Sequence, residues 1–266
     1  MVARRRLDAE LVRRGLARSR EQAVELVTSG RVTVHGRPSV KPATAVEAAA
    51  GISVSGDPSD DYVSRGAHKL VGALERLGPT LRVSGRRCLD AGASTGGFTD
   101  VLLRRGATQV VAVDVGYGQL DWRLRNDARV DVRDRTNVRS LTPDEIGGTV
   151  DLTVADLSFI SLRVVLPALT GCTDDDGDML LMVKPQFEVG RDRLGSGGVV
   201  REPALRAEAV QRVAADAGER GWGVAGVTAS PLPGPSGNVE YFLWLRRDAA
   251  ALVAGHLQTA LDEGPR

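Results

Sequence analysis

Asp90-Ala91-Gly92-Ala93-Ser94-Thr95-Gly96-Gly97-Phe98 is the stretch that decides the fold of this 266-residue chain. It follows a short apolar strand pattern and leads into a helical pattern, so it predicts a strand, a glycine loop and the start of a helix. Strand and helix patterns then alternate, which predicts an α/β domain with a doubly wound, Rossmann-like parallel sheet. We expect strands at 88–90, 109–114, 130–132, 150–156, 179–184, 224–228 and 241–245, and helices near 64–77, 99–105, 162–170 and 203–220.

The glycine loop predicts a bound nucleotide-like ligand at the carboxyl ends of the strands. Its spacing is not G-x-G-x-x-G, and Asp90 directs a carboxylate into the loop, where it would repel a pyrophosphate but could pair with a ligand amino group. Both features favour S-adenosyl-L-methionine (SAM) over a dinucleotide. Asp114 ends the second strand, where an acid can accept ribose hydroxyls, and Asp134 follows the third strand on the adenine side. Glycines that only permit a tight turn, and an Asp134 that only forms a turn, are the structural alternatives.

Lysine is rare in this chain, and its placement predicts a catalytic set. Of 35 Lys and Arg residues only Lys41, Lys69 and Lys184 are lysines. A lysine amine can lose its proton in a protein, whereas arginine stays charged, so a retained lysine can serve as a base. Lys184 and Asp156 each end a predicted strand, and Glu240 begins the last strand, so these side chains can converge with Lys69 over the crevice. A structural salt-bridge cluster, or chance retention of the lysines, is the alternative.

The net charge of +1 is unevenly spread, because residues 4–41 hold ten basic and four acidic residues. Helical spacing predicts two short helices, at 7–16 and after a capping box formed by Ser19 and Gln22, followed by strands at 32–34 and 52–54. Turn formers at 56–61 predict an interdomain boundary. We therefore expect a small α+β domain at 1–58, a linker at 59–63 and the α/β domain at 64–266.

The first domain matches a long pattern, R-L-D-x-x-L-V-x-x-G-L-A-x-S-R-x-x-A-x-x-L-V-x-x-G-x-V-x-V-x-G. This run resembles the alpha-L type RNA-binding domain of ribosomal proteins and RNA-modifying enzymes. The resemblance favours RNA binding over a merely solvated basic face. The candidate phosphate contacts are Arg4, Arg5, Arg13, Arg18, Arg20 and Arg31.

Six motifs in order identify a family for the whole chain: S-R-G-A-x-K-L at 64–70, D-x-G-A-S-T-G-G-F-T-D at 90–100, V-D-V-G-Y-G-Q-L at 113–120, D-R-T-N-V-R at 134–139, D-L-S-F-I-S at 156–161 and V-K-P-Q-F-E at 183–188. They closely resemble the hemolysin A (TlyA) family of ribosomal RNA ribose methyltransferases, whose catalytic domain belongs to the FtsJ/RrmJ 2'-O-methyltransferase superfamily. Two positions depart from the family pattern. Asp134 stands where a Glu is usual, and Asp61 stands where a basic residue is frequent.

The resemblance implies a Lys-Asp-Lys-Glu catalytic tetrad at Lys69, Asp156, Lys184 and Glu240, with SAM as methyl donor. A ribose 2'-hydroxyl is a poor nucleophile at neutral pH, and our hypothesis makes Lys184 the base that deprotonates it. The implied substrate is cytidine in small- or large-subunit ribosomal RNA, and loss of the mark would affect capreomycin-like antibiotics. The implied SAM contacts are Asp90, Gly92, Ala93, Ser94, Gly96, Gly97, Phe98, Asp114, Val115 and Asp134.

Other classes of protein fit less well. No apolar run approaches membrane-spanning length, so we expect a cytoplasmic protein, and Cys88 and Cys172 predict no disulfide. We expect a monomer that binds ribosomal RNA or ribosomal subunits and needs no metal. A non-catalytic RNA-binding assembly factor with a vestigial methyltransferase fold is the main rival. A base methyltransferase predicts an N-P-P-[YF] loop or a reactive cysteine, where this chain has D-L-S-F at 156–159.

Overall fold

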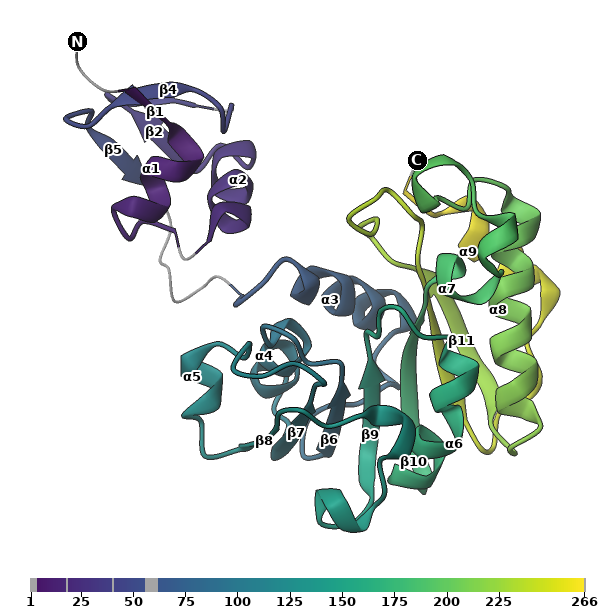
Figure 1. Ribbon diagram of the computed structural model, residues 1–266. Helices are drawn as coiled ribbons and strands as arrows, with labels where there is room; N and C mark the ends of the chain where they lie inside the picture. Colours follow the sequence, from purple (N-terminus) through teal and green to yellow (C-terminus); the bar gives the residue numbers. More distant parts are fainter. Residues whose placement is uncertain (1–3, 18, 40, 56–61, 266) are drawn as a thin grey trace. The chain divides into compact units, whose positions relative to one another are not determined.

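The computed structural model describes residues 4–17, 19–39, 41–55 and 62–265 (Figure 1). The chain divides into two compact units, Met1–Ser64 and Arg65–Arg266. The linker predicted at 59–63 falls largely on residues 56–61, Asp61 among them, which lie outside the described residues, as does Arg18.

The first unit contains the two predicted helices, α1 (Leu7–Arg13) and α2 (Arg20–Thr28), and Ser19 caps α2 by accepting the Gln22 N–H at 3.1 Å. The predicted strands are β2 (Val32–Val34) and β5 (Ile52–Val54), which form a three-stranded antiparallel sheet with β3 (Arg37–Pro38). A second antiparallel pair joins β1 (Arg4–Arg6) to β4 (Ala45–Glu47). A small core of Leu7, Leu11, Leu26, Val27 and Val32 holds these elements together.

The second unit is built on a seven-stranded sheet of order β11-β12-β10-β9-β6-β7-β8. The five strands from β10 to β8 pair in parallel, as predicted. The last strand, β12, runs antiparallel to both of its neighbours because a turn-rich loop rather than a crossover helix joins it to β11. The strands are β6 (Arg87–Ala91), β7 (Gln109–Val113), β8 (Val130–Arg133), β9 (Val150–Ala155), β10 (Thr173–Val183), β11 (Gly223–Ala229) and β12 (Tyr241–Arg246).

Helices cover the sheet in two packed groups. On one side α3 (Gly66–Leu77) packs against α4 (Gly97–Arg104); on the other, α8 (Pro203–Gly218) packs against both α6 (Leu162–Cys172) and α9 (Ala254–Asp262). The main core lies between the second group and the sheet, with Leu166, Leu181 and Trp222 fully buried. The short helices are α5 (Trp122–Arg125), α7 (Pro185–Glu188), η1 (Val138–Ser140), η2 (Asp144–Ile146), η3 (Arg191–Arg193) and η4 (Ser196–Gly198).

Two further features concern the cysteines and the lengths of the helices. Cys88 and Cys172 are both free and buried, as expected. Within the part of the chain that the structure describes, every helix is too short or too polar to cross a bilayer.

Candidate active site

The carboxyl ends of β9 and β10 bring Asp156 and Lys184 into direct contact. The Lys184 ammonium nitrogen lies 2.5 Å from Asp156 Oδ1 and donates a hydrogen bond to Ser158 Oγ at 2.9 Å. Lys184 is only 7% exposed, so its charge is largely removed from water. A buried amine is destabilised unless it is paired, and Asp156 supplies the partner.

The other two predicted residues form a second ion pair. Lys69, on α3, donates to Glu240 Oε2 at 2.6 Å, and Glu240 is 1% exposed. Glu240 Oε1 is buried without a hydrogen-bond partner among the described residues. A side chain at Gly234 would place its Cβ 2.7 Å from Oε1, so the loop packs tightly against this carboxylate. The structure thus arranges the four predicted residues as two Lys-carboxylate pairs, of which all members but the half-buried Asp156 are buried.

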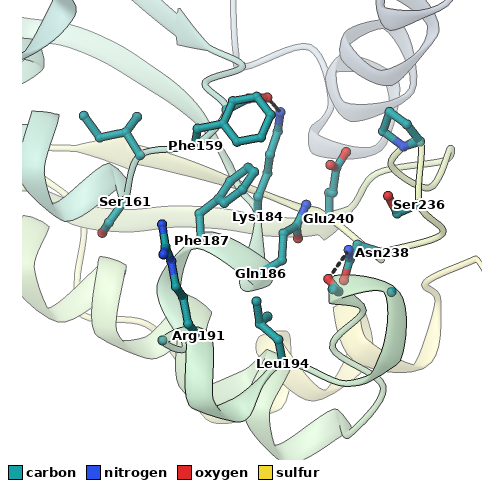
Figure 2. A pocket seen from close by; sticks show the side chains of 16 residues that line it. Phe159, Ser161, Lys184, Gln186, Phe187, Arg191, Leu194, Ser236, Asn238 and Glu240 are labelled. Carbon is teal, nitrogen blue, oxygen red and sulfur yellow. Dashed lines mark hydrogen bonds between the residues drawn. The ribbon is translucent and has the colours of Figure 1, made fainter.

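A cavity of about 540 Å³ opens beside these pairs (Figure 2). Lys184 and Glu240 line it, and Gln186 lies between them with a buried Oε1 that has no partner among the described residues. Phe159 and Phe187 line another part of the wall, with ring centroids 5.5 Å apart. A space of this size with aromatic and polar walls suits one nucleotide. We call it the acceptor cavity.

The glycine loop borders a second cavity of about 490 Å³, lined in part by Gly92, Ser94, Asp114, Val115 and Asp156. We call it the cofactor cavity. Asp114 fixes the loop, because its two carboxylate oxygens accept the Ser94 N–H at 2.8 Å and a further backbone N–H at 2.7 Å. Gly92 has φ +88°, and a Cβ there would lie 2.7 Å from the Asp156 carbonyl oxygen. Only glycine allows the loop to approach β9 this closely.

Asp90 lies beneath the loop with no exposed surface. Its Oδ2 accepts the Thr99 hydroxyl at 2.6 Å, while Oδ1 has no partner among the described residues. Burial, opposed by the Thr99 hydrogen bond and reinforced by the nearby Asp156 charge, raises the pKa of Asp90 to about 7. An unpartnered buried carboxylate oxygen is costly unless a ligand donor reaches it.

The rest of the predicted loop positions the cavity rather than lining it. Gly96 has φ +97° and precedes α4, where a Cβ would clash with the Leu124 side chain. Gly97 and Phe98 begin α4, and the Phe98 ring is buried against Phe242 at 6.1 Å. Ala93 is also buried, at 6% exposure.

The segment after β8 carries Asp134 and also two residues that line the cofactor cavity but were not singled out from the sequence. Asp134 accepts hydrogen bonds from the Arg125 guanidinium at 2.6 Å and the Gly118 N–H at 3.3 Å, and the Arg125 bond lowers its pKa. Asn137 and Val138, further along the same motif, line the cofactor cavity. A contact from Asp134 to adenine stays a prediction.

In the first unit, two buried acids on α1 organise the predicted phosphate-binding arginines. Glu10 has no exposed side-chain surface and pairs with Arg13 at 2.6 Å, Arg14 at 2.8 Å and Arg5 at 3.8 Å. Asp8 pairs with Arg20 at 3.2 Å. These contacts hold the guanidinium groups on one small unit.

The arginine side chains nevertheless remain open to solvent. Arg4 is 65% exposed and pairs with Glu47, and Arg5 is 54%, Arg13 48% and Arg20 62% exposed. Arg31 donates to the Ser55 carbonyl oxygen at 2.8 Å. Exposed guanidinium groups of this kind can bind phosphate while keeping their internal contacts. The role of each arginine in RNA binding stays a prediction.

No group of three His, Cys, Asp or Glu side chains that could hold a metal occurs within the described ranges.

Comparison with known proteins agrees with this geometry. Residues 62–247 match the FtsJ-like methyltransferase family, and residues 5–50 match the S4 domain. The 16S/23S rRNA (cytidine-2'-O)-methyltransferase TlyA of Mycobacterium tuberculosis is 63% identical over 270 residues that span both proteins completely. Hemolysin A of Brachyspira hyodysenteriae is 34% identical, covering 89% of this chain and 97% of that protein.

A solved structure described as "Putative hemolysin from Streptococcus thermophilus" superposes with a TM-score of 0.76 at 36% identity, covering 99% of this chain and 96% of that one. The seven-stranded sheet, the two ion pairs near its strand ends and the sequence matches all indicate the same family. The chain is a methyltransferase that belongs to the FtsJ-like family and carries an S4 domain at its amino-terminal end.

Proposed function

We propose that this enzyme transfers a methyl group from SAM to the ribose 2'-hydroxyl of cytidine in small-subunit ribosomal RNA, large-subunit ribosomal RNA or both. The observation that carries the proposal is the Lys184–Asp156 pair, because Lys184 lines the acceptor cavity and Asp156 lines the cofactor cavity. A relative that is 63% identical over its full length carries this activity in its name.

The residues of the cofactor cavity fit SAM. The cavity volume of about 490 Å³ suits a ligand of this size. The unpartnered Oδ1 of Asp90 can accept from the ligand ammonium, and Asp114 and Val115 can contact the nucleoside. Gly92 and Ser94 would lie against the bound SAM molecule. SAM, when bound, supplies an electrophilic methyl group on a sulfonium.

The chain's own residues then prepare the acceptor. An unprotonated Lys184 amine accepts the proton of the 2'-hydroxyl, and Asp156 stabilises the ammonium that results. Glu240, which is oriented by Lys69, contacts the acceptor ribose from the wall of the same cavity. The exposed arginines of the S4 domain bind RNA phosphates and keep the subunit in place.

A non-catalytic assembly factor would have no need of two Lys-carboxylate pairs with buried lysines beside two cavities, so the enzyme hypothesis is favoured. By the same proposal the protein works in the cytoplasm as a monomer on ribosomal subunits. Loss of its mark would then change the binding of capreomycin-like peptide antibiotics.

The test is transfer of tritiated methyl groups from SAM to purified small and large subunits that lack the modification, with product nucleosides resolved by mass spectrometry. We expect 2'-O-methylcytidine from the wild type. A Lys184→Ala variant should still bind S-adenosylhomocysteine and subunits but lose the rate that general-base catalysis contributes, about 10²- to 10⁴-fold. Firm subunit binding by the wild type without transfer would instead support the assembly factor, and normal transfer by Lys184→Ala would refute the assignment of the base.

A further inference from the structure

Ser158 occupies a position that the four-residue catalytic set leaves unexplained. Its hydroxyl accepts a hydrogen bond from the Lys184 amine at 2.9 Å. It lines both the cofactor cavity and the acceptor cavity, so it sits where the methyl donor and the acceptor would meet. The side chain is exposed, so no packing requirement accounts for a hydroxyl at this place.

The loop that carries Ser158 contacts α7 at two places. Phe159 adopts φ +65°, a conformation that bulky residues rarely take, and its largely exposed ring lies with its centroid 5.5 Å from that of Phe187. At the other end, Glu188 accepts the Ser161 hydroxyl at 2.5 Å and a backbone N–H at 2.8 Å. Because Lys184 directly precedes α7, the contacts of Glu188 tie the loop of Ser158 to the helix that follows the amine.

The number of hydrogens on an uncharged amine gives this contact a chemical meaning. A neutral lysine has two N–H bonds and one lone pair. Asp156 Oδ1 at 2.5 Å and Ser158 Oγ at 2.9 Å are placed to accept both N–H bonds. The lone pair is then left with one remaining tetrahedral direction. With Asp156 alone, the amine could rotate about its Cε–Nζ bond and point the lone pair elsewhere.

We propose that Ser158 is a positioning residue for methyl transfer, which holds one N–H of Lys184 so that the amine lone pair faces the acceptor hydroxyl. The inference rests on the proposed function, because it takes Lys184 as the base. In the step it assists, the O–H bond of the 2'-hydroxyl breaks and a third N–H bond forms on Lys184. Ser158 and Asp156 keep their hydrogen bonds to the ammonium throughout, so neither partner has to reorganise.

The experiment compares Ser158→Ala, Ser158→Thr and the wild type in steady-state methyl transfer to undermethylated ribosomal subunits. We expect Ser158→Ala to lower kcat about 10- to 100-fold, the range for a misaligned reactive group, with both KM values within about twofold of wild type. Ser158→Thr retains the γ-hydroxyl and should restore most of kcat. Ser84→Ala is the matched control. It removes an exposed hydroxyl just before β6, at the end of that strand away from the glycine loop, and should leave kcat unchanged.

Binding of S-adenosylhomocysteine by calorimetry shows that each variant is folded. A Ser158→Ala kcat within twofold of wild type would overturn the inference, and so would a Ser158→Thr variant that is folded but as slow as Ser158→Ala. A rise in KM alone would assign Ser158 to substrate binding and also overturn it. If the wild type itself forms no 2'-O-methylcytidine, the proposed function fails first, and the two failures are thereby distinguished.

Discussion

Replacing Asp90 with asparagine tests the cofactor site through the pH dependence of stability. The pKa of Asp90 rises from 3.8 to about 7, mainly through burial. Between these values the folded chain holds a proton that the unfolded chain releases, so stability falls as pH rises from 3.8 to about 7. At about 1.4 kcal/mol per pH unit, the whole window corresponds to roughly 4 kcal/mol as an upper bound. Asparagine has the same shape and removes the ionisation.

The assay is thermal unfolding of the cofactor-free protein between pH 5.5 and pH 8. Over this range the wild type should lose about 2 kcal/mol relative to Asp90→Asn, because only the part of the window from pH 5.5 to about 7 contributes. For a domain of about 200 residues this corresponds to a relative change in Tm of about 4–8 °C. A constant Tm difference across the range would refute the raised pKa of Asp90.

The same variant should bind S-adenosylhomocysteine more weakly, because Oδ1 would no longer offer a charge to the ligand ammonium. A hydrogen bond between charged groups contributes about 1.5–3 kcal/mol, which corresponds to roughly 10- to 150-fold in Kd. Wild-type affinity should also rise with pH until about pH 7, as Asp90 ionises, whereas Asp90→Asn should lack this rise. Equal affinities for the two proteins at pH 8 would show that Asp90 does not contact the ligand.

Three further substitutions test other parts of the structure. Gly92→Ala should weaken S-adenosylhomocysteine binding at least tenfold in a titration, because its Cβ would press on a carbonyl oxygen at 2.7 Å and φ is +88°; unchanged binding would contradict the close approach. Glu240→Leu should destabilise the second unit by about 3–5 kcal/mol in urea unfolding, because it leaves Lys69 buried and unpaired, and adding Lys69→Met should restore stability but not activity. Glu10→Gln should lower the melting temperature of the first unit, because it removes the carboxylate that pairs with Arg13 and Arg14. The pKa of Glu10 is lowered to about 2, chiefly by Arg13, so its contribution should vanish as pH falls from 4.5 toward 2, and an acid-independent difference in melting would oppose this.

The sequence predicted the elements whose side chains repeat regularly and missed those that depend on contacts far along the chain. Among the strands from β6 to β10, β7 and β10 carry continuous apolar runs and the others carry shorter apolar patterns. Each was expected within a few residues of its observed bounds, except that β10 begins at Thr173, ahead of the predicted start at 179. The strand β1 consists of three arginines and has no apolar pattern, so it was not predicted. It forms because its backbone pairs with β4. The reversal of β12 follows from the length of its connection, which periodicity does not encode.

The same limit applies to the site. Residues at strand ends could be placed because parallel strands end at one edge of a sheet, and this brought Asp156 and Lys184 together. Ser158 and Asn137 lie on loops and Gln186 lies on the four-residue helix α7, and the positions of these segments depend on contacts such as that between Ser161 and Glu188. A sequence pattern shows that such residues are near a motif, but it does not show which of them faces a cavity.

The arrangement of the two ion pairs gives a reason to choose between the lysines as base. Lys69 and Lys184 are both buried and both paired with a carboxylate, so burial alone does not separate them. Their surroundings do. Among the described residues that line the acceptor cavity are Lys184 and Glu240, but not Lys69, whose amine lies behind Glu240 as its partner. A base must reach the proton that it removes, whereas a charge that only orients a carboxylate need not touch the substrate. The Lys184–Asp156 pair also borders the cofactor cavity through Asp156, so proton removal and methyl transfer can occur at one place.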